Sequence, residues 1–80
     1  MRLDKFLKVA RLIKRRTVAN EVCDSARVFV NDICAKPAKK LKIGDIITIE
    51  YKNMTKKYKV LLIPQGNVSI NDAPTLYEEL

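Results

Sequence analysis

The sequence predicts an α+β domain in which two N-terminal helices pack on a small antiparallel sheet of about four strands, followed by a short C-terminal tail. Three observations support this prediction. The chain has 80 residues, enough for one small hydrophobic core. Apolar residues recur at three- and four-residue steps near the N-terminus and at two-residue steps from about residue 27. The expected helices therefore precede the expected strands, and we place the folded domain at 1–63 and the tail at 64–80.

The first helix is expected over residues 3–13, because apolar residues fall on one side of a helix there. The residues of this apolar face are Leu3, Phe6, Leu7, Ala10 and Ile13. Asp4, Lys8 and Arg11 would lie on the opposite, exposed side. Asp4 and Lys8 are four residues apart and would form a favourable acid–base pair along the helix.

The second helix is expected over residues 18–25, with Thr17 as its N-cap. Its apolar face would consist of Val18, Ala19, Val22, Cys23 and Ala26. The remaining, exposed positions are neutral or acidic, as at Glu21 and Asp24. Such a helix would be repelled by a DNA duplex, so we expect it to support the fold and not to read a groove.

Four strands follow, at 27–30, 33–35, 46–51 and 57–63. The first two would form a hairpin through Asn31 and Asp32, which tolerate the left-handed conformation of a two-residue turn. Gly44 and Asp45 form the turn before the third strand. In the tail, Val68 and Ile70 suggest a short extended piece.

The end of the tail allows two readings, a last short helix and a frayed end. For the helix, Asp72 would be the cap, and its apolar residues would be Leu76, Tyr77 and Leu80.

Four aromatic residues are expected in the core and not as stacking platforms: Phe6, Phe29, Tyr51 and Tyr58. Cys23 and Cys34 lack metal-ligand spacing and are expected to be reduced core residues.

Positive charge is concentrated at the N-terminus. The chain has a net charge of +7, and residues 2–17 contain seven of its sixteen basic residues and one acid. A second cluster follows at Lys36, Lys39, Lys40 and Lys42, whereas residues 60–80 carry only acids. A basic turn at the end of an amphipathic helix indicates a polyanionic partner such as nucleic acid.

Several function classes are disfavoured. The chain has no histidine and no Ser, Cys or carboxylate arrangement suited to catalysis, so we expect neither an enzyme nor a metal or organic cofactor. No apolar run approaches the length of a membrane span, and no signal peptide is evident. We therefore expect a cytoplasmic protein.

The candidate contact residues are basic side chains, because guanidinium groups form paired hydrogen bonds to phosphate. Those expected to contact the polyanion are Arg2, Arg11, Lys14, Arg15 and Arg16. Those expected to support them are Asp4, Lys5, Lys8, Lys39 and Lys40. Two roles stay open for Asp4: it would hold an arginine in place, or it would favour the helix N-terminus through the helix dipole.

Several short motifs occur together in a characteristic order: RLDKFL, IKRRT, a helix, R-V-x-V-N, a K-P element and I-G-D-x-I. Together they resemble the RNA-binding domain named after ribosomal protein S4, over about residues 1–63. The stand-alone bacterial members of that family are the most similar. Ala26 and Asp32 depart from its pattern, since glycine is usual at both positions.

The resemblance is greatest to the RqcP ribosome quality-control group, and also extends to the heat-shock ribosome-recycling group. It implies an rRNA- and tRNA-binding factor that joins a large ribosomal subunit obstructed by peptidyl-tRNA and supports alanine tailing by a partner, RqcH. It further implies a monomer off the ribosome. The alternatives are recycling of aborted large subunits, a helix-turn-helix DNA-binding regulator, and a module related to RNA-modifying enzymes.

Overall fold

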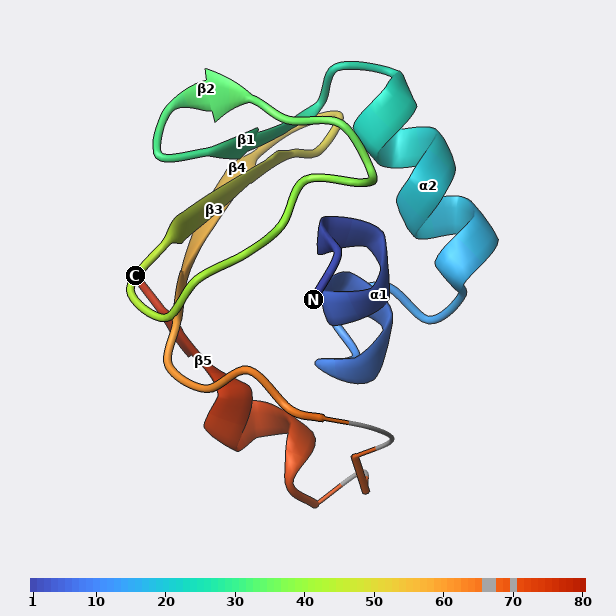
Figure 1. The fold of residues 1–80 in the computed structure, drawn as a ribbon. Helices are drawn as coiled ribbons and strands as arrows, with labels where there is room; N and C mark the ends of the chain where they lie inside the picture. The colour runs from blue at the N-terminus through green and yellow to red at the C-terminus, as the bar shows by residue number, and fades with distance from the viewer. Residues whose placement is uncertain (66–67, 70) are drawn as a thin grey trace.

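The computed structural model describes residues 1–65, 68–69 and 71–80, and it has the predicted α+β architecture (Figure 1). Its elements are α1 (Leu3–Val9), α2 (Arg16–Asp24), β1 (Val28–Val30), β2 (Ile33–Cys34), β3 (Ile46–Glu50), β4 (Thr55–Val60), the 3-10 turn η1 (Ala73–Leu76) and β5 (Tyr77–Glu79). The strands form one antiparallel sheet in the order β2-β1-β3-β4-β5. The fold class is confirmed, with five strands where about four were expected.

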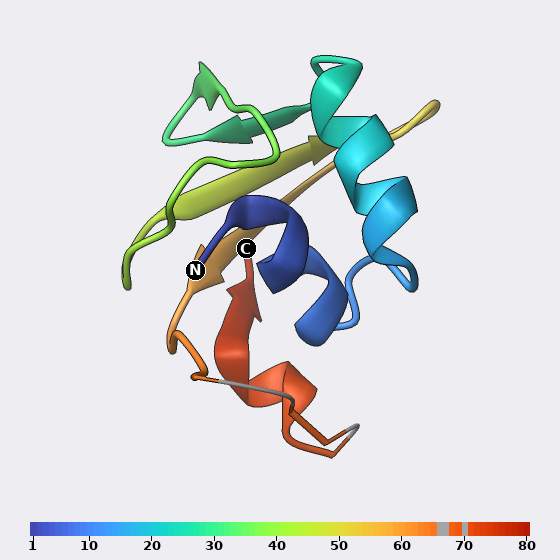
Figure 2. The same cartoon turned by 45° about the vertical axis from the view of Figure 1, so that its right-hand side comes forward.

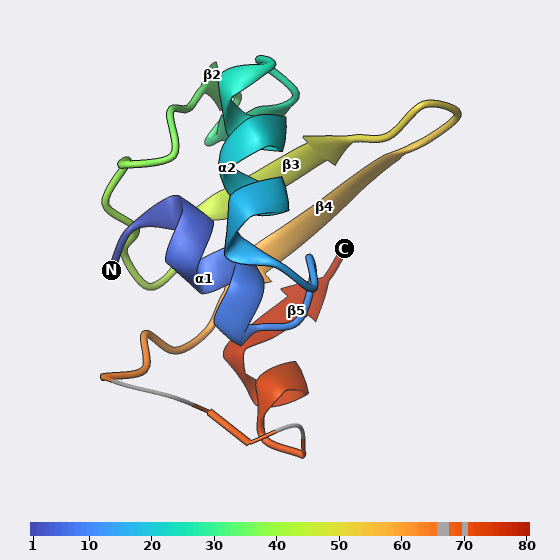
Figure 3. The same ribbon diagram turned by 90° about the vertical axis from the view of Figure 1, so that its right-hand side faces the viewer.

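Both helices lie against one face of the sheet (Figures 1 and 2). The strand register places Val28 opposite Ile49 and Ile47 opposite Tyr58, and these side chains are buried together with Leu3, Phe6 and Leu7 of α1. Alternation along each strand therefore builds one apolar face, which the helices cover. Figure 3 shows the β3–β4 hairpin reaching beyond the helices.

Helix α1 ends at Val9, four residues before the predicted end. Arg11 adopts a left-handed conformation with φ of 59°. The N–H of Arg11 donates to the Lys8 carbonyl at 3.0 Å, and that of Leu12 donates to the Leu7 carbonyl at 3.0 Å. These two bonds form a Schellman motif, which stops the helix although no glycine is present.

Helix α2 starts at Arg16, so the prediction of Thr17 as its N-cap was wrong. The Ala19 N–H donates to the Arg15 carbonyl at 3.0 Å, which closes the first turn one residue earlier. The helix ends in the same motif as α1, with φ of 62° at Ala26 and a bond from its N–H to the Cys23 carbonyl. Ala26 is therefore exposed outside the helix and is not part of its apolar face.

The β1–β2 hairpin turns through Asn31 and Asp32, whose φ values of 52° and 67° confirm the predicted turn. The Asn31 side chain also joins the hairpin to the start of β3, since its amide donates to Asp45 at 3.1 Å and its oxygen accepts from the Ile46 N–H at 3.0 Å. Gly44, with φ of 96°, makes the turn before β3 as expected.

The tail takes part in the sheet. Its end is not frayed: Asp72 is the N-cap as expected, but the helix is a single 3-10 turn, η1, and β5 then pairs with β4 through Tyr77 opposite Val60. Tyr77 therefore belongs to a strand, and Leu80 is exposed. Strand β4 ends at Val60, three residues before the predicted end at residue 63, and Leu62 beyond it is exposed. Of the expected extended piece, Ile70 lies outside the described residues.

Two of the four aromatic residues occupy the core as expected. Phe6 and Tyr58 are buried, whereas Phe29 is half-buried and Tyr51 is exposed. The helices do not cover the sheet face of Phe29, which explains its exposure. The two cysteines are both free, but only Cys23 is a core residue, because Cys34 lies exposed on the edge strand β2.

Candidate nucleic-acid interface

A buried carboxylate lies at the centre of the basic N-terminal region. Asp4, in the first turn of α1, has a side chain that is only 2% exposed. The expectation that Asp4 lies on the exposed side and pairs with Lys8 was therefore wrong. Its Oδ1 accepts from the N–H of Lys5 at 2.8 Å, and the rest of the carboxylate faces residues from α2 and from the chain before α1.

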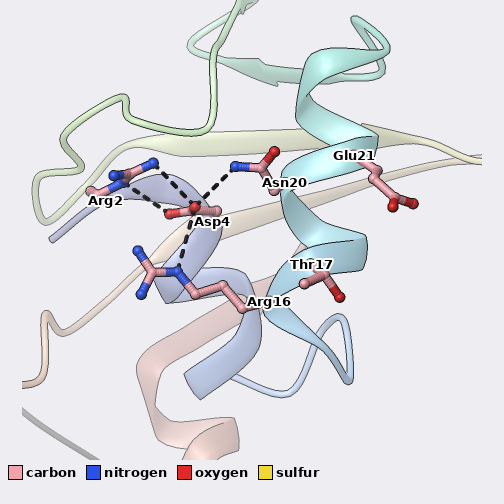
Figure 4. A pocket seen from close by; sticks show the side chains of 6 residues that line it. All are labelled: Arg2, Asp4, Arg16, Thr17, Asn20 and Glu21. Atoms are coloured by element: carbon pink, nitrogen blue, oxygen red, sulfur yellow. Dashed lines mark hydrogen bonds and ion pairs between the residues drawn. The ribbon is translucent and has the colours of Figure 1, made fainter.

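Three side chains converge on this carboxylate, as Figure 4 shows. Arg2 binds it through Nε at 3.2 Å from Oδ1 and through Nη2 at 3.3 Å from Oδ2. Arg16 places Nε at 3.5 Å from Oδ2, and the Asn20 amide donates to the same oxygen at 3.5 Å. We call Arg2, Asp4, Arg16 and Asn20 the arginine cluster. It joins the start of α1 to the first turns of α2.

The arginine cluster holds two positive charges in fixed positions at the surface. The side chains of Arg2 and Arg16 are each 48% exposed, whereas their carboxylate partner is buried. Each guanidinium has five N–H donors, and Asp4 uses only some of them. The remaining donors are free for an anion, and the cluster carries a net charge of +1. A pair of forked donors held in this way suits phosphate oxygens.

The arginine cluster borders an open hollow of about 470 Å³. Thr17 and Glu21 of α2 complete its lining (Figure 4). Glu21 is exposed and adds a negative charge on the far side of the hollow from Arg2. A polyanion would therefore be attracted to the Arg2 and Arg16 side and disfavoured along the acidic face of α2.

The loop that carries the second basic cluster lies beside Arg2. The N–H of Leu3 donates to the Lys39 carbonyl at 2.8 Å, and that of Leu41 donates to the Met1 carbonyl at 2.9 Å. Arg2 and Lys40 form an isolated antiparallel bridge between these bonds. The backbone thus brings exposed Lys39 and Lys40 next to the arginine cluster, although they lie far along the chain from it.

The other predicted contact residues are exposed but are not joined to the arginine cluster. Lys14 and Arg15 lie in the connection between the helices. Arg11 shares a small hollow of about 170 Å³ with Lys8 and Val68, at the C-terminal end of α1. The predicted supporting residue Lys5 differs from these, because it is half-buried and donates its backbone N–H to Asp4.

Asn20 was overlooked as part of this region, since the sequence suggested only an exposed polar residue of α2. The available signal was its spacing from Arg16, because residues four apart lie on the same face of a helix. Both side chains therefore face Asp4. Of the two roles left open for Asp4, holding an arginine in place matches its ion pairs with Arg2 and Arg16, although the sequence did not indicate which arginines these would be.

A buried thiol lies at the centre of α2. Burial raises the pKa of the Cys23 thiol from 9.0 to about 11, and the charges of Asp4 and Asp24 add to the effect. Such a thiol stays protonated and unreactive at neutral pH.

The described residues contain no group of three His, Cys, Asp or Glu side chains placed to hold a metal ion. None of the described helices has the length and apolar content needed to cross a bilayer.

Comparisons with known proteins find relatives in one family. A model of the S4 domain family matches residues 1–47. The RQC P-site tRNA stabilizing factor of Streptococcus pneumoniae is 47% identical over 78 residues, which cover 98% of this chain and 88% of that protein. The factor of the same name from Helicobacter pylori J99 is 44% identical over 64 residues, covering 80% and 76%. The trimeric structure of Vibrio cholerae Heat Shock Protein 15 matches with a TM-score of 0.90 at 32% identity, covering 100% of this chain and 81% of that one.

Proposed function

Because the chain belongs to the S4 domain family, we propose that it binds rRNA and tRNA on a large ribosomal subunit obstructed by peptidyl-tRNA. There it supports ribosome-associated quality control, in which a stalled chain is extended with alanine. Relatives that align over nearly the whole chain are named for stabilising a P-site tRNA, and this name gives the proposal its tRNA component.

The observation that carries the proposal is the arginine cluster. Two half-exposed guanidiniums are held by one buried carboxylate, at 3.2 and 3.5 Å. Lys39 and Lys40 extend the positive surface beside them. Contacts of this kind fix a protein on the RNA backbone and respond to RNA shape more than to base sequence.

These positions support the following roles. Arg2 and Arg16 contact phosphates directly, and Asp4 positions both of them. Arg11, Lys14 and Arg15 contact RNA on the neighbouring surface of the helix connection, and Lys5, Lys8, Lys39 and Lys40 add electrostatic attraction. The protein carries out no catalytic step, since binding alone stabilises the obstructed complex for the tailing factor, RqcH.

The remaining parts of the proposal concern partners and location. The protein works in the cytoplasm, on the ribosome, and is a monomer away from it. A second candidate function, the recycling of aborted large subunits after heat shock, is favoured by the similarity to Heat Shock Protein 15 over the whole length of this chain. A DNA-binding role is disfavoured because α2 exposes Glu21 and Asp24.

The proposal is tested by co-sedimentation with purified large subunits, with and without bound peptidyl-tRNA. We expect tight binding that depends on the peptidyl-tRNA, and loss of that binding in Arg2→Ala/Arg16→Ala. Arg27→Ala/Lys52→Ala is the matched control, because it also removes two positive charges, from exposed residues that do not line the hollow at the arginine cluster. With about five phosphate contacts, a fourfold rise in salt should weaken the complex by roughly 10²-fold. Binding that ignores the peptidyl-tRNA and survives the double substitution would contradict the proposal.

A further inference from the structure

A second hollow, of about 410 Å³, lies between the β1–β2 hairpin and the loop at 36–39. Its apolar lining comes from Val30, Ile33, Ala35 and Ala38. Lys36 and Lys39 complete the basic part of the lining, and no acidic residue takes part in it. This hollow therefore combines apolar walls with positive charge, whereas the hollow at the arginine cluster is bordered by an acid.

Part of the apolar lining of this hollow, at Ile33 and Ala38, is open to solvent. Ile33 lies opposite Val30 on the edge strand β2 and is 72% exposed, although Val30 is only 3% exposed. The helices cover the middle of the sheet and leave this edge free (Figure 1). A large aliphatic side chain exposed to this extent beside two lysines suits a ligand that has both an apolar surface and negative charge.

One wall of the hollow is joined directly to the arginine cluster. The Lys39 carbonyl accepts from the Leu3 N–H at 2.8 Å, and the Pro37 carbonyl accepts from the Asp4 N–H at 3.1 Å. The bridge between Arg2 and Lys40 lies beside these bonds. A strand of RNA held at Arg2 would therefore continue over the loop toward Lys39 and Lys36.

Acidic residues do not block this route. Asp32 lies in the hairpin turn and does not line the hollow. Asp45 is engaged by the Asn31 side chain at 3.1 Å and by the Lys42 N–H at 2.9 Å. The lysines of the hollow thus provide its charge without a competing carboxylate in the lining.

We propose that this hollow receives an unstacked nucleotide of the bound RNA, with the base against Ile33 and Ala38 and its phosphate between Lys36 and Lys39. The inference rests on the proposed function and adds a base contact to it. Bases in loops and single strands are free to turn outward and pack on apolar side chains. Such a contact would add preference for an unpaired nucleotide to a surface that otherwise holds only phosphates.

The test is a titration of isotope-labelled protein followed by NMR, for which a 9.2 kDa chain is well suited. The probes are a single-stranded oligoadenylate of about six nucleotides and a ribose-phosphate chain of the same length without bases. We expect the oligoadenylate alone to shift the methyl signals of Ile33 and Ala38, against which the base would lie. Ile33→Ser should weaken oligoadenylate binding by about 5-fold and leave binding of the base-free chain unchanged.

Ile43→Ser is the matched control. Ile43 is 66% exposed, close to the value for Ile33, but it does not line the hollow. Its substitution should leave the affinity for both probes as in the wild type. Equal loss of affinity in the two variants would show a general effect of removing an exposed isoleucine and would overturn the inference.

The outcomes separate the inference from the function on which it rests. Identical shifts with both probes, confined to Arg2, Arg16 and their neighbours, would overturn the base contact and leave the proposed function standing. No shifts with either probe, together with no co-sedimentation with large subunits, would overturn the proposed function itself.

Alkylation by N-ethylmaleimide gives a second readout on the intact complex. Cys34 lines the hollow and is exposed, whereas Cys23 is buried and provides an internal unreactive reference. We expect large subunits carrying peptidyl-tRNA to protect Cys34 from the reagent. Protection of Cys34 without any base-dependent shift in the titration would indicate a protein occupant and would contradict the nucleotide assignment.

Discussion

Replacing Asp4 with asparagine separates the positioning of arginines from their charge. The substitution keeps the size of the side chain and raises the net charge of the chain from +7 to +8. If charge alone governed binding, the variant would bind RNA more tightly. If the carboxylate acts by holding Arg2 and Arg16, the variant binds RNA more weakly. The two explanations thus predict changes in RNA affinity of opposite sign.

The expected size of the effect follows from the contacts. Asp4 holds Arg2 at 3.2 Å and Arg16 at 3.5 Å, and both arginine side chains are half-exposed. Each ion pair therefore contributes about 1 kcal/mol to folding after solvent screening, so Asp4→Asn lowers the free energy of unfolding by about 2 kcal/mol. Ordering two released arginines on RNA costs about 0.5–1.5 kcal/mol each. The affinity should fall roughly 30-fold.

The assay is binding to large subunits carrying peptidyl-tRNA, at several salt concentrations. Asp24→Asn is the matched control, because it also raises the net charge by one, and Asp24 is exposed at the last residue of α2. Circular dichroism establishes that each variant is folded at the assay temperature. Arg2→Lys/Arg16→Lys is a second variant that keeps the charge of +7 but loses the forked donors, and it should also bind more weakly.

Binding of Asp4→Asn that equals or exceeds that of the wild type at every salt concentration would refute the positioning role. The same conclusion would follow if Arg2→Lys/Arg16→Lys bound as well as the wild type. In either case, the basic surface would act through its total charge, and the geometry around Asp4 would serve only the fold.

Three further predictions concern the stability of the fold. Ala26 has φ of 62°, so Ala26→Gly should relieve strain and raise the melting temperature by about 5 °C; an unchanged or lower value in calorimetry would contradict this. Burial raises the pKa of the Cys23 thiol from 9.0 to about 11, so the protonated thiol contributes up to roughly 3 kcal/mol to stability, which is fully present below pH 9 and is lost as the pH rises to 11. Urea unfolding at about pH 8 and pH 10.5 measures how far the free energy of unfolding falls at alkaline pH, and this fall should be smaller in Cys23→Ala than in the wild type. An equal fall in both proteins would contradict the role of the Cys23 thiol. Tyr77 packs edge-on against Tyr58, with ring centroids 5.4 Å apart, so Tyr77→Ala should lower the free energy of unfolding by about 1–2 kcal/mol; wild-type stability would show that β5 adds little to the sheet.

Periodicity predicted the core of α1 well and its end poorly. Leu3, Phe6, Leu7 and Ala10 are buried as their spacing indicated. The helix nevertheless stops at Val9, since Arg11 adopts a left-handed conformation. The end of a helix is predicted from sequence largely by glycine, so an arginine at position 11 did not indicate that α1 would end there.

The centre of the arginine cluster could not be predicted from local pattern. Within α1, the spacing of Asp4 and Lys8 suggested an exposed pair. The actual partners of Asp4 are Arg2, Arg16 and Asn20, and only the packing of α2 against α1 brings the last two within reach. Strand β5 was missed for a similar reason, because Tyr77–Glu79 is a strand only through its pairing with β4.

The measurement that tests the central claim most directly is alanine tailing of stalled chains in cells whose own tRNA-stabilizing factor has been deleted. The wild-type chain and Arg27→Ala should restore the tails, and Arg16→Ala, which removes one guanidinium held by Asp4, should not. Full restoration by Arg16→Ala would contradict the role of the arginine cluster. Failure of the wild-type chain to restore any tails would contradict the proposed function as a whole.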